Sequence, residues 1–262
     1  MDFELFNTYS NKTELFIPLD DNDIRIYACG PTVYDYIHVG NARPLIIFDV
    51  LVRFLKLIYP KVTYVRNITD VDDKIIVQAN QNKESINNLT ERTIKAFSDD
   101  ADALFVKKPD FEPRATEHIQ EMLKMIKVLL ENGYAYLSDG HVLFSVASMT
   151  SYGKLSGMNL SEMIDGARVE VSDYKKEPAD FVLWKPSKTG ELGWHSDFGF
   201  GRPGWHIECS AMSEKYLGKQ FDIHAGGLDL IFPHHENEIA QSCCAFNTEF
   251  MAKYWMHNGY IT

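Results

Sequence analysis

Hydrophobic positions near the N-terminus follow the order strand, helix, strand. Residues 24–30, IRIYACG, form a short apolar run that ends in glycine, which is typical of a buried strand. Residues 41–60, NARPLIIFDVLVRFLKLIYP, are largely apolar and predict a helix. Residues 62–70, VTYVRNITD, are rich in β-branched and aromatic side chains and predict a second strand. This order is that of a βαβ unit, whose two strands lie parallel and are joined by a right-handed crossover.

The pattern then becomes helical over residues 87–133 and changes character after that. Within this stretch, EHIQEMLKMIKVLLENG places its apolar residues on one helical stripe and ends at Gly133, a residue type that favours helix ends. The stripe consists of Ile119, Met122, Leu123, Ile126, Leu129 and Leu130. Residues 134–200 instead contain short strand-like runs separated by Gly, Ser and Lys. We interpret them as an inserted module that is rich in antiparallel strands.

Helix and strand signals alternate again after the insertion. Residues 204–218, GWHIECSAMSEKYLG, and 235–246, HENEIAQSCCAF, predict helices. Residues 221–227, FDIHAGG, and 253–261, KYWMHNGYI, predict strands. We therefore expect a doubly wound α/β domain that is interrupted by the insertion and binds its ligands beyond the carboxyl ends of the parallel strands.

Composition and charge exclude several classes of protein. The 262 residues are 45% hydrophobic, which allows a large core. The N-terminal residues MDFELFNTYS do not have the pattern of a signal peptide, and no apolar run approaches the ~20 residues that a membrane span needs. We expect a cytoplasmic protein without a membrane partner. The net charge of −11 argues against bulk attraction to nucleic acid, so any such contact must be local.

Potential metal ligands are concentrated in residues 232–242, FPHHENEIAQS. His234 and Glu238 are four positions apart, so a helix brings an imidazole and a carboxylate to one face, and both groups are good zinc ligands. Such a pair is also common on helix surfaces, and two ligands do not make a site. Softer ligands could come from the cysteines, which are Cys29, Cys209, Cys243 and Cys244. Cys29 and Cys209 would complete a mixed sulfur, nitrogen and oxygen site, although spacing alone does not select them. The adjacent residues Cys243 and Cys244 can also be interpreted as small core residues.

Five segments resemble the signature blocks of cysteinyl-tRNA synthetases, a family of class I aminoacyl-tRNA synthetases. They occur in the order of that family and are CGPTVYDYIHVGNARP, RNITDVDDKII, ADFVLWK, GRPGWHIECSAM and HAGGLDLIFPHHENEIAQS. The resemblance implies an α/β fold with a Rossmann-like, parallel-sheet catalytic domain that is split by an inserted connective module. Residues 1–118 would form the first half of the catalytic domain, 119–200 the insertion and 201–262 the second half. The strands at 24–30 and 221–227 should then share one sheet.

The same resemblance implies a monomeric, cytoplasmic cysteine–tRNA ligase. Such an enzyme activates L-cysteine with ATP, in the presence of Mg2+, to cysteinyl-adenylate and transfers the cysteine to tRNA(Cys). It also implies one zinc ion (Zn2+) per chain, held by Cys29, Cys209, His234 and Glu238. Zinc takes a thiol as thiolate, so coordination would separate cysteine from serine without an editing step. The metal is expected to select the substrate and not to activate water.

Residues 38–41, HVGN, resemble the HIGH signature of class I synthetases. They follow a predicted strand and open a helix, where backbone N–H groups and the helix dipole favour phosphate. The resemblance makes His38 and Asn41 catalytic, as hydrogen-bond donors to charge that develops at the α-phosphate. It assigns cysteine contacts to Gly30, Thr32, Thr69 and Trp205. It assigns nucleotide contacts to His38, Gly40, Asn41, Gly227, Asp229 and Ile261.

Several of these residues also have ordinary structural interpretations. Without the family, Trp205 would be read as a core aromatic residue and Asp229 as a turn residue after a strand. His206 and His224 are candidates for supporting the cysteine pocket from behind.

The family's second signature, KMSKS, follows a segment like WMHNGYIT, and the sequence ends at Thr262. We expect the lysine loop and the anticodon-binding region to lie outside these residues, which should therefore bind cysteine better than they activate it. Two alternatives remain. A mycothiol-pathway cysteine ligase has similar zinc and HIGH blocks, but its hosts have GC-rich genomes, whereas Ile, Lys and Asn are abundant here. The chain could also be a non-catalytic zinc-binding module.

Overall fold

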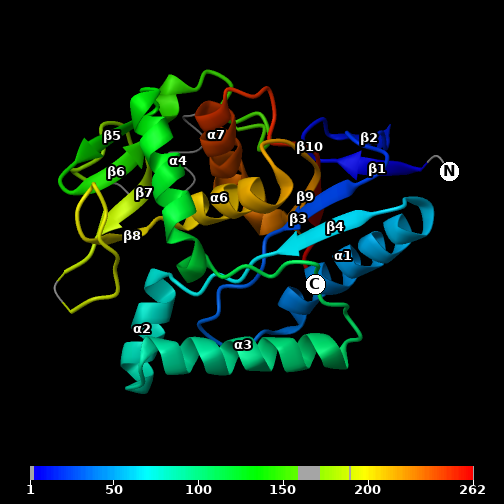
Figure 1. The fold of residues 1–262 in the computed structure, drawn as a ribbon, viewed down its shortest axis with the longest axis horizontal. Coiled ribbons are helices and arrows are strands. Elements are labelled where there is room, and N and C mark those ends of the chain that lie inside the picture. The colour runs from blue at the N-terminus through cyan, green and yellow to red at the C-terminus, as the bar shows by residue number, and fades with distance from the viewer. Residues whose placement is uncertain (1–2, 159–171, 189, 262) are drawn as a thin grey trace. The chain divides into compact units, whose positions relative to one another are not determined.

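A computed structural model describes residues 3–158, 172–188 and 190–261 (Figure 1). The chain divides into two units according to its internal contacts. Unit 1 comprises Met1–Glu117, Tyr216–Asp229 and Ala252–Thr262, and unit 2 comprises His118–Lys215 and Leu230–Met251. Part of the expected insertion, residues 159–171, and the last residue, Thr262, lie outside the described residues. None of the helices in the described ranges combines the length and the apolar character that crossing a membrane requires.

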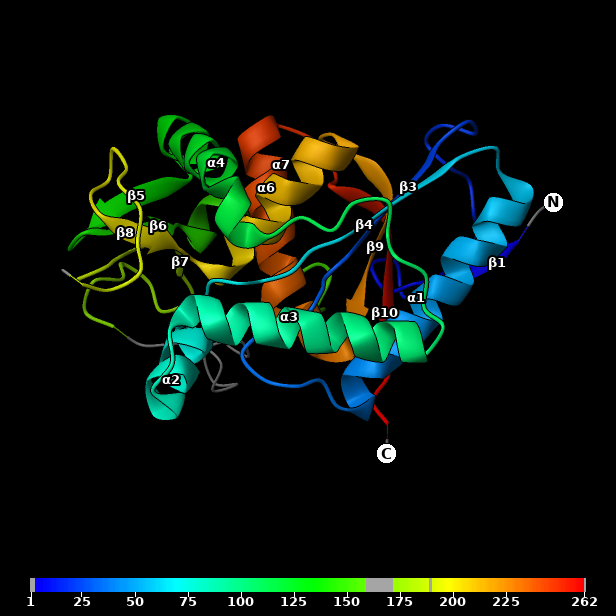
Figure 2. The ribbon, with the colours of Figure 1, turned by 60° about the horizontal axis from the view of Figure 1, so that its bottom comes forward.

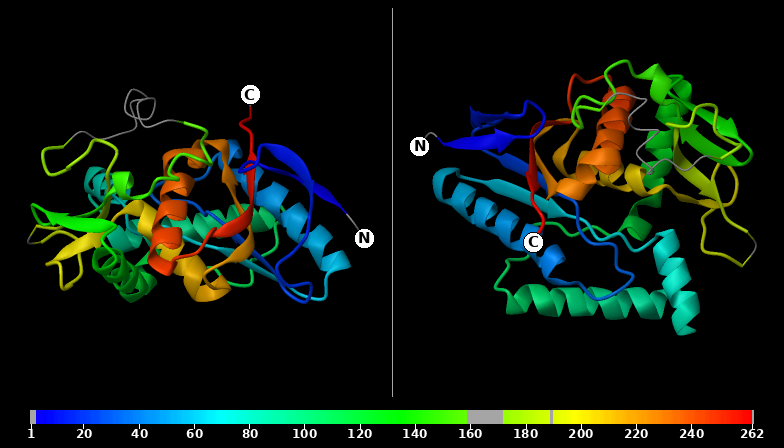
Figure 3. Two further views of the ribbon diagram at one scale, coloured as in Figure 1. Left: turned by 90° about the horizontal axis from the view of Figure 1, so that it is seen from above. Right: turned by 180° about the vertical axis from the view of Figure 1, so that it is seen from behind.

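A four-stranded parallel sheet forms the centre of unit 1, in the order β10-β9-β3-β4 (Figures 1 and 3). Its strands are β3 (Ile24–Ala28), β4 (Val62–Arg66), β9 (Phe221–Gly227) and β10 (Ala252–Asn258). β3 pairs directly with β9, so the prediction that residues 24–30 and 221–227 share one sheet is confirmed. Nearly all side chains of β3, β4 and β9 are buried, including the polar residues Arg66, Asp222 and His224, as expected of parallel strands that are covered on both faces.

The helix α1 (Val39–Ile58) connects β3 to β4, as predicted, and buries Phe48, Val52 and Leu55 in the core of this sheet.

Two elements of unit 1 were not predicted. A short antiparallel hairpin, β1 (Glu4–Asn7) and β2 (Lys12–Leu15), precedes β3.

The second unpredicted element is the helix α2 (Asp73–Asn82), which follows β4 and precedes α3 (Ile86–Ala103; Figure 2). The helical signal over residues 87–133 proves to be discontinuous. Residues 104–114 contain no helix, and Phe105 has a positive φ of 59° that a helix does not tolerate. The signal therefore belongs to two helices, α3 in unit 1 and α4 in unit 2.

Unit 2 contains a four-stranded antiparallel sheet in the order β5-β6-β7-β8. Its strands are β5 (Ala135–Ser138), β6 (His141–Phe144), β7 (Phe181–Pro186) and β8 (Gly201–Pro203). The strand-like runs between residues 134 and 200 thus form β5, β6 and β7, and the sheet takes its last strand from residues just beyond the expected insertion. The helix α4 (Ile119–Glu131) buries Met122, Ile126 and Leu129 of the predicted stripe and ends shortly before Gly133, whose φ is +77°.

Two further helices complete the elements that position the candidate site. They are α6 (Trp205–Leu217) and α7 (Glu236–Phe246), and both agree closely with the predicted ranges. A one-turn π-helix, Ile231–His235, leads directly into α7. Short 3-10 turns occupy Ala115–His118, Val146–Ser148 and Leu228–Leu230.

Candidate metal and substrate sites

Three of the predicted metal ligands lie together in unit 2. Cys209 comes from α6, His234 from the π-helical turn and Glu238 from α7, and their donor atoms lie within 4.8 Å of one another. Nε2 of His234 is 3.1 Å from Oε1 of Glu238, and His234 is also hydrogen-bonded to the Cys209 thiol. All three side chains are buried, so the pair at spacing i, i+4 is not a surface pair. The described part of the chain therefore presents a sulfur, nitrogen and oxygen cluster of the expected kind.

Buried hydrogen bonds between α6 and α7 hold these ligands in place. Nε2 of Gln241 donates to the carbonyl oxygen of His206 and to Oγ of Ser210, each at 2.9 Å. Oγ of Ser210 in turn donates to the carbonyl oxygen of Glu238 at 3.3 Å. Ser210 is the neighbour of Cys209 in the sequence, so these contacts fix the helix that carries the thiol against the helix that carries the carboxylate. Sequence reasoning missed this support, because nothing in the sequence marks Ser210 and Gln241 as partners.

The electrostatics of the cluster favour a positive charge. Burial works to lower the pKa of His234, but the Glu238 carboxylate and the Cys209 thiol outweigh it and hold this pKa well above its ordinary value. Nδ1 of His206 lies 2.9 Å from Nδ1 of His234, and burial together with the His234 charge keeps the pKa of His206 well below its ordinary value. The cluster thus holds a proton on the His234 imidazole, and a bound metal cation could supply the positive charge in place of that proton. Cysteine, histidine and glutamate are also the ligand types that zinc takes in proteins.

Trp205 lies beside this cluster and is not a core residue. Its ring stacks on the imidazole of His234, with ring centres 4.1 Å apart and planes 22° apart, and 37% of the residue remains exposed. Trp205 stands four residues before Cys209 on α6, so the helix places both on one side. The ring of His206 also lies beside that of His234, with ring centres 5.1 Å apart. His224 belongs to unit 1, where it is buried and stacks on Trp255 at 4.4 Å.

Most other candidate residues gather at the carboxyl edge of the parallel sheet in unit 1. They follow or end its strands and are Cys29, Gly30 and Thr32 after β3, Thr69 after β4, Gly227 and Asp229 at the end of β9, and Ile261 after β10. The Cys29 N–H donates to the carbonyl oxygen of Ala225 at 3.1 Å, and Thr32 and Thr69 form an isolated parallel bridge. This edge is where open α/β sheets bind their ligands.

The end of β9 is shaped around an exposed carboxylate. A Cβ atom on Gly227 would lie 2.3 Å from Oδ1 of Asp229, so only glycine leaves room for that side chain in its present position. Asp229 is exposed in the 3-10 turn after the strand, where a ligand could reach it. The turn-residue interpretation and the ligand interpretation of Asp229 are therefore compatible.

His38 and Asn41 form a reciprocal cap at the start of α1. Nδ1 of His38 accepts the Gly40 N–H at 3.1 Å, and the His38 N–H donates to Oδ1 of Asn41 at 3.1 Å. A Cβ atom on Gly40 would lie 2.8 Å from Cε1 of His38, so the glycine makes room for the imidazole. Both polar side chains are exposed, and the cap does not use Nε2 of His38 or Nδ2 of Asn41. The HVGN motif therefore has a structural role that the sequence reasoning did not include.

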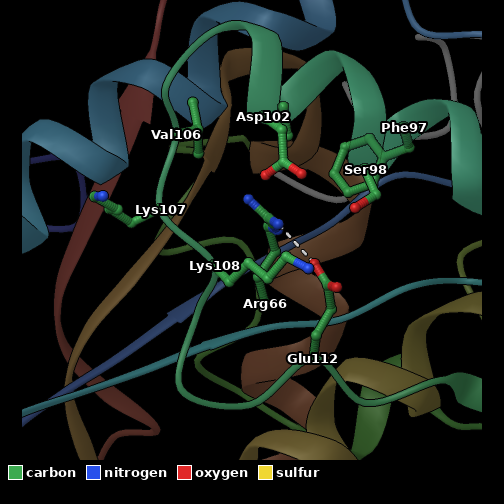
Figure 4. Close-up of a pocket in the computed structure, with 9 residues that line it drawn as sticks. Arg66, Phe97, Ser98, Asp102, Val106, Lys107, Lys108 and Glu112 are labelled. Carbon is green, nitrogen blue, oxygen red and sulfur yellow. Dashed lines mark hydrogen bonds and ion pairs between the residues drawn. The ribbon is translucent and has the colours of Figure 1, made fainter.

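A separate recess in unit 1 contains none of the predicted site residues (Figure 4). The Arg66 guanidinium occupies its centre, 2.6 Å from the Glu112 carboxylate and 5.1 Å from the ring centre of Phe97. The recess has a volume of about 10 Å³, room for one water molecule at most. It is too small to be the binding site of an amino acid or a nucleotide.

Comparison with known proteins relates this arrangement to a family. Residues 15–262 match the family model described as tRNA synthetases class I (C) catalytic domain. A cysteine–tRNA ligase of Rhodospirillum centenum is 59% identical over 262 residues, which cover all of this chain and 58% of that protein. A cysteine–tRNA ligase of Rhodospirillum rubrum is 59% identical over 261 residues and is covered to 57%. The chain thus spans a little under three-fifths of the length of these curated relatives.

The fold is also similar to a solved structure, that of Mycobacterium tuberculosis methionyl-tRNA synthetase in complex with methionyl-adenylate. The TM-score is 0.67 over 91% of this chain and 57% of that chain, with 14% sequence identity. At this identity the likeness concerns the fold, and it confirms the predicted α/β architecture of class I synthetases. The relatives confirm the resemblance to cysteinyl-tRNA synthetases that the five sequence blocks indicated. On the match over residues 15–262, the chain belongs to the family of class I (C) tRNA synthetase catalytic domains.

Proposed function

We propose that the chain is the catalytic part of a cytoplasmic cysteine–tRNA ligase, which converts L-cysteine and ATP to cysteinyl-adenylate and then charges tRNA(Cys). The observation that carries the proposal is the buried cluster of Cys209, His234 and Glu238 beside the half-exposed Trp205. This cluster offers the ligand types for a thiol-binding metal, in a chain whose relatives at 59% identity are cysteine–tRNA ligases. ATP would be used with Mg2+. The expectation of a monomer stays a prediction.

The cluster supplies three of the four zinc ligands that we propose, and the family resemblance assigns Cys29 as the fourth. Zinc, when bound, would stabilise the thiolate form of the substrate cysteine, whose free thiol has a pKa of ~8.5. The hydroxyl of serine ionises far less readily, so the same ligand set discriminates against serine. The ring of Trp205, stacked on His234, keeps that imidazole in one orientation and covers one side of the cluster.

On the nucleotide side, the proposal uses the carboxyl edge of the sheet in unit 1. Gly30, Thr32 and Thr69, together with Trp205, would contact the amino acid. His38 and Asn41 would donate hydrogen bonds to charge that develops at the α-phosphate, supported by the N–H groups at the start of α1. The nucleotide would lie against Gly40 and against three residues at the ends of the neighbouring strands, which are Gly227, Asp229 and Ile261.

Calorimetry with the zinc-loaded chain tests the amino-acid specificity. We expect cysteine to bind at least about 10²-fold more tightly than serine, and binding to disappear after chelation of the metal. The variant Cys209→Ala should lose this preference, whereas Cys243→Ala, which changes a buried thiol on α7 outside the cluster, should retain it. Equal affinity for cysteine and serine would contradict the proposal.

A second experiment distinguishes the enzyme from the alternatives. We expect the complete gene product to catalyse cysteine-dependent exchange between ATP and pyrophosphate and then to charge tRNA(Cys). Transfer to the amino-sugar acceptor instead of tRNA would identify a mycothiol-pathway ligase. Zinc and cysteine binding without any exchange would identify a non-catalytic module. The expectation that these 262 residues bind cysteine better than they activate it is tested by running both assays on one preparation.

A further inference from the structure

Asn67 is a buried side chain that joins two of the proposed cysteine contacts. It directly follows β4 in unit 1 and is only 1% exposed. Its Oδ1 accepts the N–H of Gly30 at 2.9 Å, and its Nδ2 donates to Oγ1 of Thr69 at 3.2 Å. A backbone N–H can only donate, so Gly30 determines which end of the amide is the oxygen. One side chain thus connects the segment after β3 with the segment after β4.

The surrounding backbone shows how closely these two segments approach each other. The Thr69 N–H donates to the carbonyl oxygen of Pro31 and the Val33 N–H to that of Thr69, each at 3.1 Å. A Cβ atom on Gly30 would lie 1.7 Å from the carbonyl oxygen of Asn67, so the loop at Gly30 packs directly on the backbone of Asn67. Since regular pairing between β3 and β4 ends at Ala28 and Arg66, the Asn67 amide bridges the two segments where the strand ladder no longer does.

We propose that Asn67 is a positioning residue for amino-acid binding. This proposal rests on the proposed function, in which Gly30, Thr32 and Thr69 contact the cysteine. Asn67 is buried and would not touch the substrate; it holds the Gly30 N–H and the Thr69 hydroxyl at a fixed separation at the carboxyl edge of the sheet. An amide is suited to this because it accepts on one side and donates on the other, which neither a carboxylate nor an aliphatic side chain can do.

Steady-state kinetics of pyrophosphate exchange by the complete gene product tests this role. We expect Asn67→Ala to raise the KM for cysteine by about tenfold, because two buried hydrogen bonds are lost and the contacts are no longer preorganised. The KM for ATP should change by less than about twofold, because the proposed nucleotide contacts do not pass through Asn67. Asn67→Asp keeps an acceptor for the Gly30 N–H and loses the amide donor, so it should give a smaller rise. An equal change in both KM values would overturn the proposal.

A matched control separates positioning from general destabilisation. Asn7 is also a buried asparagine of unit 1; its Oδ1 accepts the N–H groups of Tyr9 and Trp255, and its Nδ2 donates to the Lys253 carbonyl oxygen. Asn7→Ala should lower stability and leave the KM for cysteine unchanged. If Asn7→Ala raised this KM as much as Asn67→Ala, the effect would be one of stability only.

Amide hydrogen exchange provides a test that does not depend on activity. In Asn67→Ala, the Gly30 N–H should exchange at least about tenfold faster than in the wild type, while the Thr69 N–H, which donates to Pro31, should change less. Unchanged protection of Gly30 would refute the role of Asn67 even if the wild-type protein showed no cysteine-dependent exchange. If the Gly30 N–H exchanged faster in Asn67→Ala but the wild-type protein showed no cysteine-dependent pyrophosphate exchange, the result would instead count against the proposed function.

Discussion

At the scale of single residues, Asp222 shows how one buried carboxylate can connect distant segments. It accepts the N–H groups of Leu19 at 2.6 Å and Arg25 at 2.8 Å, and so ties β9 to the start of β3. Burial raises the pKa of Asp222 above its ordinary value, although these two N–H groups act in the opposite direction.

The raised pKa of Asp222 predicts a pH dependence of stability. Between the ordinary carboxyl pKa and the raised one, the folded state holds a proton that the unfolded state has released. The contribution of Asp222 to the free energy of unfolding is therefore greatest below the ordinary pKa and is lost as the pH rises through the raised pKa. Denaturant unfolding of the wild type and Asp222→Asn across the acidic range measures this. A difference between the two proteins that does not vary with pH would contradict it.

The cysteines provide a second prediction at this scale. Cys209 contacts His234, whereas burial raises the pKa of Cys243 to about 11 and leaves it a neutral core thiol. We expect the purified protein to contain about one zinc per chain by metal analysis, consistent with one four-ligand site. Cys209→Ala should reduce the zinc content, and Cys243→Ala should not. A full zinc complement in Cys209→Ala would show that this thiol is not a ligand.

At the scale of elements, α2 illustrates a helix that depends on its ends. The helix has 10 residues, of which only Ile75 and Ala79 are buried, so tertiary packing stabilises it weakly. Its N-terminus is capped by Asp72, whose carboxylate accepts the Lys74 N–H at 2.7 Å. The residue after its last turn, Lys83, has a positive φ of 56°.

Removal of this cap should destabilise the protein measurably. We expect Asp72→Ala to lower the free energy of unfolding by about 1 kcal/mol, since the side-chain acceptor for a backbone N–H at the helix start is lost. Gln81→Ala changes an exposed side chain of the same helix and should have an effect near zero. Denaturant unfolding compares the two variants. Equal effects would mean that the cap contributes nothing.

At the scale of the whole molecule, the parallel sheet of unit 1 is assembled from both ends of the chain. β9 and β10 lie between residues 221 and 258, far from β3 in the sequence, and β9 pairs with β3 on one side and β10 on the other. Ile223 on β9 is fully buried in a core that also contains Ile26 and Leu55. The stability of this unit therefore depends on packing between segments that are remote in sequence.

A substitution in the central strand should thus have a large effect. We expect Ile223→Ala to lower the free energy of unfolding by about 2–5 kcal/mol, because it removes buried methyl groups and leaves a cavity. Leu57→Ala, on the exposed side of α1 where 83% of the residue is accessible, should change it by less than about 0.5 kcal/mol. Thermal or denaturant unfolding measures both. Similar effects at the two positions would show that Ile223 is not in the core.

The sequence by itself determined the long buried elements. Residues 221–227 were predicted as a strand and form β9 with the same bounds, because the apolar residues Phe221, Ile223 and Ala225 recur at the period-two spacing of a strand. α6 was predicted within residues 204–218 and ends before Gly218, whose φ is +85°. The pairing of His234 with Glu238 also followed from spacing, since residues four apart meet on a helix.

Tertiary structure alone decided the rest. The hairpin of β1 and β2 and the helix α2 are short and largely exposed, so they leave little periodic signal. The approach of Cys209 to His234 depends on the packing of α6 against α7, and spacing could not select that thiol; the family resemblance did. The roles of Asn67 and of the cap formed by His38 and Asn41 arise from hydrogen bonds between specific atoms. A hydrogen bond requires two groups within about 3 Å, and only the folded chain determines which groups meet.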